Sequence, residues 1–171
     1  NNYGPYQFPE KLIPTVILKS LRGETIPVYG DGGAIRDWLF VDDHVRAIMA
    51  ALEQGKIGET YNIGTNAEKT TVQMVEAITT LLDELVPNSP HKPHKSLMKF
   101  VTDRPGHDRR YAIDAAKVEN EIGWKTQTTW EEGLAKTIRW YQENQEWTNR
   151  IRNGAYRDYY KKHYGVEVGS V

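Results

Sequence analysis

The stretch of this sequence most suited to chemistry places three arginines and a histidine around a Pro-Gly turn. Arg104, His107, Arg109 and Arg110 all lie between residues 103 and 110. Arginine offers a rigid fork of N–H donors to phosphoryl oxygens, so the cluster suits a diphosphate ligand. Arg109 and Arg110 lead into an expected strand, where adjacent side chains point to opposite faces and cannot both meet one ligand. The pattern alone favours the other interpretation, a solvated turn with local Asp–Arg ion pairs.

A second candidate is Arg36, which follows the glycine-rich turn of residues 30–33. The turn has the composition of a phosphate-cradling loop, but it lacks the G-x-G-x-x-G spacing. An extended segment follows it instead of a helix, so a hairpin-like turn is the better interpretation. Arg36 is either an anion ligand or the surface partner of Asp37, and the pattern does not choose between them.

The remaining polar clusters are explained without a ligand. The acidic pairs Asp42–Asp43 and Asp83–Glu84 lie at or on expected helices, where capping and solvation account for them. His91 and His94 occur in a proline-rich connection with no third metal ligand nearby, so we expect a flexible loop and no metal site. The tyrosine-rich tail, from about residue 146 to 164, is expected to pack against the protein, with stacking on a sugar or base as the alternative.

Motifs that would carry a reaction by themselves are missing from the chain. There is no Tyr-x-x-x-Lys, G-x-S-x-G, H-E-x-x-H or Walker A sequence. The absence of cysteine excludes a disulfide framework, a Cys-ligated zinc site and thiol catalysis. The sequence therefore predicts binding groups without a self-sufficient catalytic constellation.

Charge and hydropathy exclude two further classes of partner. Of the 171 residues, 22 are Lys or Arg and 23 are Asp or Glu, which gives a net charge of −1. Proteins that bind a phosphate backbone normally carry a basic excess, so nucleic acid and anionic membranes are not expected as partners. No apolar run approaches the roughly 20 residues that a membrane-spanning helix needs. We expect a soluble, cytoplasmic protein.

The elements that would position these groups alternate between short strands and helices, a pattern that predicts an α/β fold. Helices are expected at about 11–21, after a cap at Asp42 or Asp43, after a cap at Thr70 or Thr71, from a cap at Asp114 to Gly123, and after a cap at Thr128 or Thr129. Strands are expected at 26–29, 35–41, 60–63, 99–102 and 111–113. The helix after Asp42 or Asp43 has the clearest apolar stripe, made of Val45, Ile48, Met49 and Leu52.

Residues 1–14 (NNYGPYQFPEKLIP) resemble the stretch that opens the C-terminal half of dTDP-glucose 4,6-dehydratases, which are NAD-dependent extended short-chain dehydrogenase/reductase enzymes. Further matches follow in the family's order, at residues 27–30, 36–41, 58–64, 103–114, 123–124 and 153–156. NNYGP is shared widely among nucleotide-sugar epimerases and dehydratases. The run DRPGHDRRYAID, at 103–114, is much more specific to hexose 4,6-dehydratases. The resemblance covers essentially the whole chain.

The resemblance implies a set of residues that bind a dTDP-hexose. Those that match the family's substrate site are Asn1, Lys11, Leu12, Pro27, Val28, Tyr29, Arg36, Thr71, Asp103, Arg104, Pro105, Gly106 and His107. Arg36, Arg104 and Lys11 would neutralise the diphosphate, and residues 27–29 would form a flat apolar wall for the pyrimidine. Asn2 matches a residue at the nicotinamide end of the NAD site. Thr71 stands where many members have Asn, and its hydroxyl offers fewer donors.

The resemblance also implies a division of the chain. Residues 1–171 would form the C-terminal half of an enzyme, in which 1–37 and 65–125 belong mainly to the substrate-binding lobe. Residues 38–64 and about 128–145 would pack on an N-terminal Rossmann domain. That domain would supply the catalytic residues and the glycine-rich NAD fingerprint, so no catalytic residue is expected here and the chain alone would be inactive. The full-length enzyme is expected to be a homodimer.

Two other functions stay open. One is a different nucleotide-sugar enzyme of the same superfamily, an epimerase or a decarboxylase, which the run at 103–110 disfavours. The other is a non-catalytic carbohydrate-binding or interaction module, suggested by the tyrosine-rich tail and the missing catalytic groups.

Overall fold

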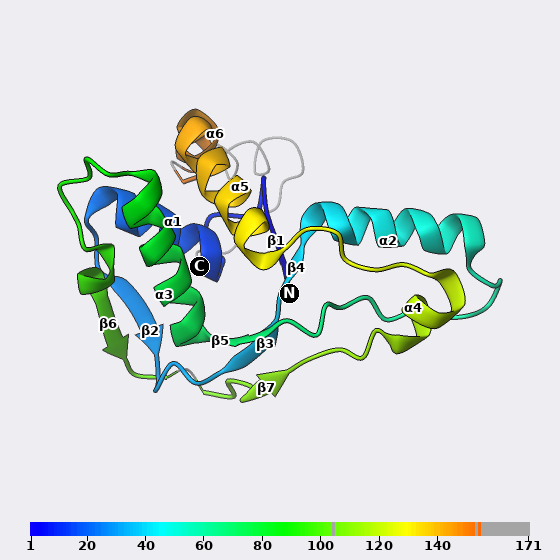
Figure 1. Ribbon diagram of the computed structural model, residues 1–171. Helices are drawn as coiled ribbons and strands as arrows, with labels where there is room; N and C mark the ends of the chain where they lie inside the picture. The colour runs from blue at the N-terminus through cyan, green and yellow to red at the C-terminus, as the bar shows by residue number, and fades with distance from the viewer. Residues whose placement is uncertain (104, 153, 155–171) are drawn as a thin grey trace.

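The computed structural model describes residues 1–103, 105–152 and 154 and has the expected α/β character (Figure 1). Its elements, in chain order, are β1 (Asn2–Tyr3), α1 (Leu12–Arg22), β2 (Ile26–Tyr29), β3 (Ile35–Asp37), β4 (Leu39–Phe40), α2 (Val41–Gln54), β5 (Glu68–Thr70), α3 (Thr71–Leu85), the 3-10 turn η1 (His94–Leu97), β6 (Met98–Val101), β7 (Arg110–Tyr111), α4 (Ala116–Ile122), α5 (Trp130–Glu143) and α6 (Gln145–Arg152).

The strands pair in three small groups. β1 pairs with β4 and β2 pairs with β6, both in parallel. β3 lies between β5, which is antiparallel to it, and β7, which is parallel. Pro27 is tolerated in β2 because the described residues place a neighbouring strand on one side of β2 only.

The main core lies between α1, α3, α5 and strand β2. Ile17 of α1, Ile78 of α3 and Ile138 of α5 are each fully buried there. Their positions follow the spacing of three or four residues that brings apolar side chains to one face of a helix. Gly23 ends α1 in the left-handed conformation, with φ at 68°, as expected for a glycine C-cap.

Two of the predicted helix starts are confirmed in detail. Thr70 caps α3 and Thr129 caps α5, and each hydroxyl accepts a hydrogen bond from the backbone N–H three residues later. Gln73 and Glu132 return the bond to the backbone N–H of their capping threonine, which completes a capping box at both helices.

A second, smaller core forms where α2 packs against α4 and the segment that follows it. Figure 1 shows these two helices together at one end of the molecule, away from α1 and α3. The buried members of this second core are Leu39, Ala47, Ala115, Val118, Ile122 and Trp124. The predicted stripe on α2 is largely outside it: Val45, Ile48, Met49 and Leu52 are 53, 51, 47 and 78% exposed.

The predicted cap of α2 is wrong. The helix begins at Val41, after Phe40, so Asp42 and Asp43 lie inside its first turn. The Asp43 carboxylate is buried and accepts hydrogen bonds from the backbone N–H groups of Gln127, at 2.8 Å, and Thr128, at 3.1 Å. Asp43 therefore fastens α2 to the loop before α5, a contact between residues more than eighty positions apart.

Three strand or cap boundaries also differ from the expectation. The extended segment at 35–41 is interrupted at Trp38, so it forms β3 and β4 before α2 begins. Residues 60–63 form no strand, because no segment in the described part of the chain pairs with them. Asp114 accepts a bond from the Ala116 N–H, but the residue that caps α4 is Ala115. Among the described residues, no helix is both long and apolar enough to cross a membrane.

Candidate functional site

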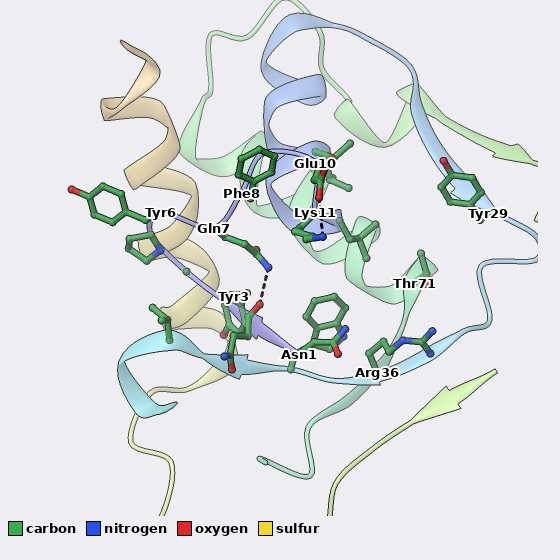
Figure 2. Close-up of a pocket in the computed structure, with 18 of the residues that line it drawn as sticks. Asn1, Tyr3, Tyr6, Gln7, Phe8, Glu10, Lys11, Tyr29, Arg36 and Thr71 are labelled. Atoms are coloured by element: carbon green, nitrogen blue, oxygen red, sulfur yellow. Dashed lines mark hydrogen bonds and ion pairs between the residues drawn. The ribbon is translucent and has the colours of Figure 1, made fainter. Parts of the chain in front are cut away.

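A cleft of about 1010 Å³ opens between the N-terminal segment, α1, the strands β2 and β3, and the first residue of α3 (Figure 2). Nine of the residues predicted to bind substrate or cofactor line it: Asn1, Asn2, Lys11, Leu12, Pro27, Tyr29, Arg36, Thr71 and His107. These residues come from separate parts of the sequence. The fold therefore brings most of the predicted site to one place.

Arg36 is the cleft's most available cation. It lies on β3, and its Nη1 donates to the backbone oxygen of Ile35 at 2.7 Å. Its guanidinium lies 5.8 Å from the centre of the Tyr111 ring. Arg36 forms no ion pair with any carboxylate in the part of the chain that the structure describes. Its remaining N–H donors are thus available to an anion, and the alternative of a surface pair with Asp37 is wrong.

The other charged groups near the cleft already have partners. Lys11 pairs with Glu10 at 2.9 Å, on the exposed rim. His107 Nδ1 lies 2.8 Å from Asp103 Oδ1, and its side chain is only 12% exposed. Asp103 is held close to the backbone at Gly30, where a Cβ atom would lie 2.8 Å from the Asp103 carboxylate. The Asp103–His107 pair is therefore built against the glycine turn that precedes β3.

Arg109 and Arg110 point to different carboxylates, as the alternation of a strand predicts. Arg109 binds Asp31 at 2.9 Å and Arg110 binds Glu68 at 2.6 Å. The arginines hold the pKa values of Asp31 and Glu68 below their usual range through side-chain hydrogen bonds. Neither arginine lines the cleft. Both arginines therefore form ion pairs, but their partners lie 78 and 42 positions away and one of them is a glutamate, so the interpretation as local Asp–Arg pairs is wrong for these two residues.

The apolar wall is formed by two residues of β2 and not by three. Pro27 and Tyr29 line the cleft, and Tyr29 is 44% exposed. Val28 lies between them in the strand and points the other way, so its side chain is fully buried in the main core. A contact between Val28 and a ligand would therefore have to come from its backbone.

Asn2 and Thr71 are each held by one specific hydrogen bond. The Asn2 side-chain nitrogen lies 2.6 Å from His44 Nδ1 at the start of α2. Partial burial lowers the pKa of His44, which favours a neutral ring able to accept this bond. The Thr71 hydroxyl lies 3.3 Å from the backbone oxygen of Ala34. Its single hydroxyl proton is directed there, so its lone pairs remain for a donor from a ligand.

The turn at 103–107 contributes less than predicted. His107 is the only member of this turn in the described residues that lines the cleft, because Asp103, Pro105 and Gly106 are not among its lining residues. Arg104 lies outside the described residues, as do most of the match at 153–156 and the tail from 155 onward.

Sequence reasoning missed several residues that line the cleft. They are Tyr3, Tyr6, Gln7, Phe8 and Trp38. In the view of Figure 2, Tyr6 and Phe8 lie toward one end of the cleft, and Tyr29, Arg36 and Thr71 lie toward the other. Gln7 is fixed in place because its Nε2 donates to the Asn2 backbone oxygen at 2.7 Å. A signal for all five was present, because four lie in the motif at residues 1–14 and Trp38 lies in the match at 36–41.

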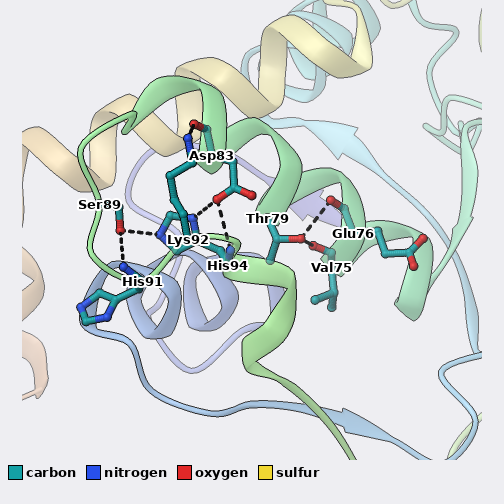
Figure 3. Close-up of polar contacts among 8 residues, drawn as sticks. All are labelled: Val75, Glu76, Thr79, Asp83, Ser89, His91, Lys92 and His94. Atoms are coloured by element: carbon teal, nitrogen blue, oxygen red, sulfur yellow. Dashed lines mark hydrogen bonds and ion pairs between the residues drawn. The ribbon is translucent and has the colours of Figure 1, made fainter.

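The prediction of a flexible loop at His91 and His94 is wrong for His94, which is fully buried (Figure 3). Its Nδ1 lies 2.5 Å from Asp83 Oδ1 and its Nε2 lies 2.9 Å from Ser89 Oγ. The His94 backbone N–H also donates to Asp83, at 3.1 Å. With both ring nitrogens satisfied, His94 braces the connection before β6 against α3. Because its side chain is fully buried and both ring nitrogens have partners, we assign His94 a structural role.

No group of three or more metal-ligating side chains occurs among the described residues. The glycine turn at 30–33 leads into β3 and not into a helix, so it does not provide a phosphate-binding helix N-terminus. What the cleft offers is one unpaired guanidinium, a few hydroxyl and amide groups, and an apolar wall. That combination suits an anionic ligand with a flat ring.

The comparison with known proteins agrees with this chemistry. Residues 1–137 match the family model described as GDP-mannose 4,6 dehydratase. The chain belongs to the GDP-mannose 4,6 dehydratase family. The resemblance to dTDP-glucose 4,6-dehydratases is also confirmed. The enzyme of that name from Xanthomonas campestris pv. campestris is 55% identical over 157 residues, which cover 92% of this chain and 45% of that protein.

Solved structures match this chain over similar fractions of its length and of their own. DesIV, a dTDP-glucose 4,6-dehydratase from Streptomyces venezuelae solved with NAD and TYD bound, is 44% identical with a TM-score of 0.78, over 88% of this chain and 44% of its own. UDP-glucose 4-epimerase from Thermotoga maritima, solved with UDP-glucose, is 31% identical with a TM-score of 0.72, over 85% of this chain and 44% of its own. The chain thus spans less than half the length of the relatives it matches.

Proposed function

We propose that this chain forms the substrate-binding half of a dTDP-glucose 4,6-dehydratase, the lyase that converts dTDP-glucose to dTDP-4-keto-6-deoxyglucose and water. Relatives of that name at more than 50% identity support the proposal. The observation that carries it is the cleft itself. It combines the unpaired guanidinium of Arg36 with the apolar wall of Pro27 and Tyr29, as a diphosphate next to a pyrimidine requires.

Each part of the nucleotide sugar then has a place in the cleft. Arg36 and Lys11 would donate to the diphosphate, and Thr71 would bond one of its oxygens. Pro27 and Tyr29 would cover the pyrimidine. Asn1, at the other side of Arg36, would contact the sugar or the phosphate next to it. In the same proposal the turn at 103–107 would add contacts to the substrate, with Arg104 neutralising charge on the diphosphate.

NAD is proposed as the cofactor of the complete enzyme, as in the DesIV structure solved with NAD. NAD would supply the hydride chemistry at the sugar's C4 and C6 carbons. This chain would supply only Asn2, at the nicotinamide end, with its amide oriented by the 2.6 Å contact to His44. The catalytic residues and the rest of the NAD site would come from an N-terminal Rossmann half.

The exposed stripe of α2 supports a further part of the proposal. Ile48 and Leu52 are 51 and 78% exposed although the spacing of the stripe is that of a buried helix face. We propose that the Rossmann half covers this stripe. In this arrangement residues 38–64 and about 128–145 would pack on the Rossmann half, and residues 1–37 and 65–125 would mainly build the substrate lobe. The complete enzyme is proposed to be a cytoplasmic homodimer.

Calorimetric titration with dTDP, UDP and GDP tests the substrate assignment. We expect dTDP to bind more tightly than the other two. Arg36→Ala should raise the Kd for dTDP about ten- to a hundredfold, because one charge-assisted hydrogen bond contributes roughly 1.5–3 kcal/mol. Arg139→Ala is the matched control, since Arg139 is exposed on α5, outside the cleft, and its loss should leave the Kd unchanged.

Each other outcome favours a different function. Tighter binding of UDP would favour an epimerase, as in the Thermotoga maritima relative solved with UDP-glucose. Binding of a free glycan without dTDP would favour a carbohydrate-binding module. Equal binding by the unmodified protein and Arg36→Ala would contradict the placement of the diphosphate.

A further inference from the structure

The carboxylate of Asp37 is buried directly behind the cleft. Asp37 lies on β3 between Arg36 and Trp38, both of which line the cleft, but its own side chain is 4% exposed and does not. Adjacent residues of a strand point to opposite faces, so Arg36 faces the cleft while Asp37 faces the segment on the other side. A buried carboxylate is costly unless its oxygens are hydrogen-bonded.

Among the described residues, the hydrogen bonds to the Asp37 carboxylate all come from one turn. Asp37 Oδ2 accepts from the Thr65 backbone N–H at 2.9 Å. Asp37 Oδ1 accepts from the Thr65 hydroxyl at 2.5 Å and from the Ala67 backbone N–H at 3.1 Å. The neighbouring Gly64 is needed for this approach, because a Cβ atom there would lie 2.6 Å from Asp37 Oδ2. The turn at 64–67 is thus wrapped around one carboxylate.

This turn leads into β5 and then to Thr71, which lines the cleft. β5 runs antiparallel to β3, with Asp37 opposite Glu68 and Ile35 opposite Thr70. At the far end of the pairing, the Thr71 backbone N–H donates to the Ala34 oxygen at 3.0 Å. The segment from Thr65 to Thr71 is therefore fastened to β3 at both ends, with Asp37 at one end and Ala34 at the other.

We propose that Asp37 is a positioning residue that holds Arg36 and Thr71 at the spacing required by the diphosphate of the nucleotide sugar. Asp37 touches no ligand and acts through the strand and the turn that carry the two contacting residues. The inference rests on the proposed function, because it takes the diphosphate as the ligand of Arg36.

The test uses the complete polypeptide that carries this sequence, with Kd for dTDP and KM and kcat for the dTDP-hexose as readouts. Asp37→Asn keeps the shape of the side chain but turns one acceptor into an N–H₂ group that faces a donor. We expect Kd and KM to rise about tenfold, with kcat changed far less, because binding of ground state and transition state weakens together. Asp42→Asn is the matched control, an exposed aspartate with the same change of charge, and should leave all three constants unchanged.

A double-mutant cycle separates positioning from a general loss of structure. If Asp37 acts through Arg36, then Asp37→Asn should add little to the Kd of Arg36→Ala. Thr65→Ala removes a single donor to Asp37 and should raise Kd by a smaller factor. This variant replaces Asp37→Asn in the test if Asp37→Asn does not fold. Additive effects of the two substitutions, or a folded Asp37→Asn with unchanged Kd, would overturn the inference. Absence of dTDP binding by the unmodified protein would instead overturn the proposed function, and this inference with it.

Discussion

Helices α1, α3 and α5 bury their apolar stripes inside this chain, whereas α2 leaves its stripe exposed. Ile17, Ile78 and Ile138 are inaccessible to solvent, but Ile48 of α2 is 51% exposed. All four helices carry apolar residues at intervals of three or four positions in the sequence. Such a stripe therefore indicates a helix face that packs against another surface, but it does not indicate that this surface belongs to the same chain.

The largest expected difference between the two regions is in the cost of removing one of these side chains. Ile138→Ala should lower the free energy of unfolding by about 2–5 kcal/mol, because it leaves a cavity in the main core. Ile48→Ala is the matched control in α2 and should change the same free energy by less than about 0.5 kcal/mol. Urea denaturation followed by circular dichroism measures both values.

Equal losses for these two variants would contradict the comparison, since they would show that the stripe of α2 is covered within the chain. A loss for Ile48→Ala that appears only when the Rossmann half is present would sharpen it. That result would identify the cover directly.

The two left-handed glycine caps provide a second, smaller contrast. Gly123 ends α4 with φ at 74° and open space around it, so Gly123→Ala should cost only the left-handed penalty, about 1–2 kcal/mol. Gly23 ends α1 with φ at 68°, and a Cβ atom there would lie 2.4 Å from the His91 ring. Gly23→Ala should therefore cost more than Gly123→Ala in thermal unfolding. The opposite order would show that His91 moves away freely.

The smallest expected effect is the pH dependence from exposed ion pairs in each region. Hydrogen bonds from Lys117 and Arg110 lower the pKa of Glu59 and Glu68, respectively. A carboxyl with a lowered folded-state pKa stabilises the fold above its unfolded pKa of about 4.3, and this contribution is lost as the pH falls through the folded value. The unfolding midpoint should fall slightly between pH 5 and pH 3, and less so in Glu59→Gln and Glu68→Gln. A midpoint that rises on acidification would contradict this assignment.

Local signals predicted most of the helices but few of the long-range contacts. The caps Thr70, Thr129 and Gly23 depend on residues within four positions. The sequence pattern located Gly23 and narrowed each threonine cap to one of two neighbouring residues. Asp43 was misplaced as a cap because its true partners, Gln127 and Thr128, lie more than eighty positions away. Such a contact leaves no local periodicity to detect.

The site was predicted mainly through the family resemblance, and its physical logic became visible only in three dimensions. The sequence pattern left both Arg36 and Arg109 open to an anion or a carboxylate partner, yet Arg36 forms no ion pair among the described residues and Arg109 is bound to Asp31. His94 lies in a stretch with the composition of a loop, but its ring is buried and bonded to Asp83 and Ser89. Residues 60–63 have a strand-like composition, but a strand forms only when a neighbour is present to pair with it.

The most direct test of the central claim, that the cleft binds the nucleotide and the α2–α4 region does not, is a residue-by-residue NMR titration with dTDP. We expect shifts of the backbone amide signals of Lys11, Tyr29, Arg36 and Thr71, all from cleft-lining residues, and unchanged signals along α4 and along α2 beyond its first turn, where Val41 lines the cleft. The Arg36→Ala variant should need about ten- to a hundredfold more dTDP for the same shifts. Shifts confined to the exposed face of α2, or none at saturating dTDP, would contradict it.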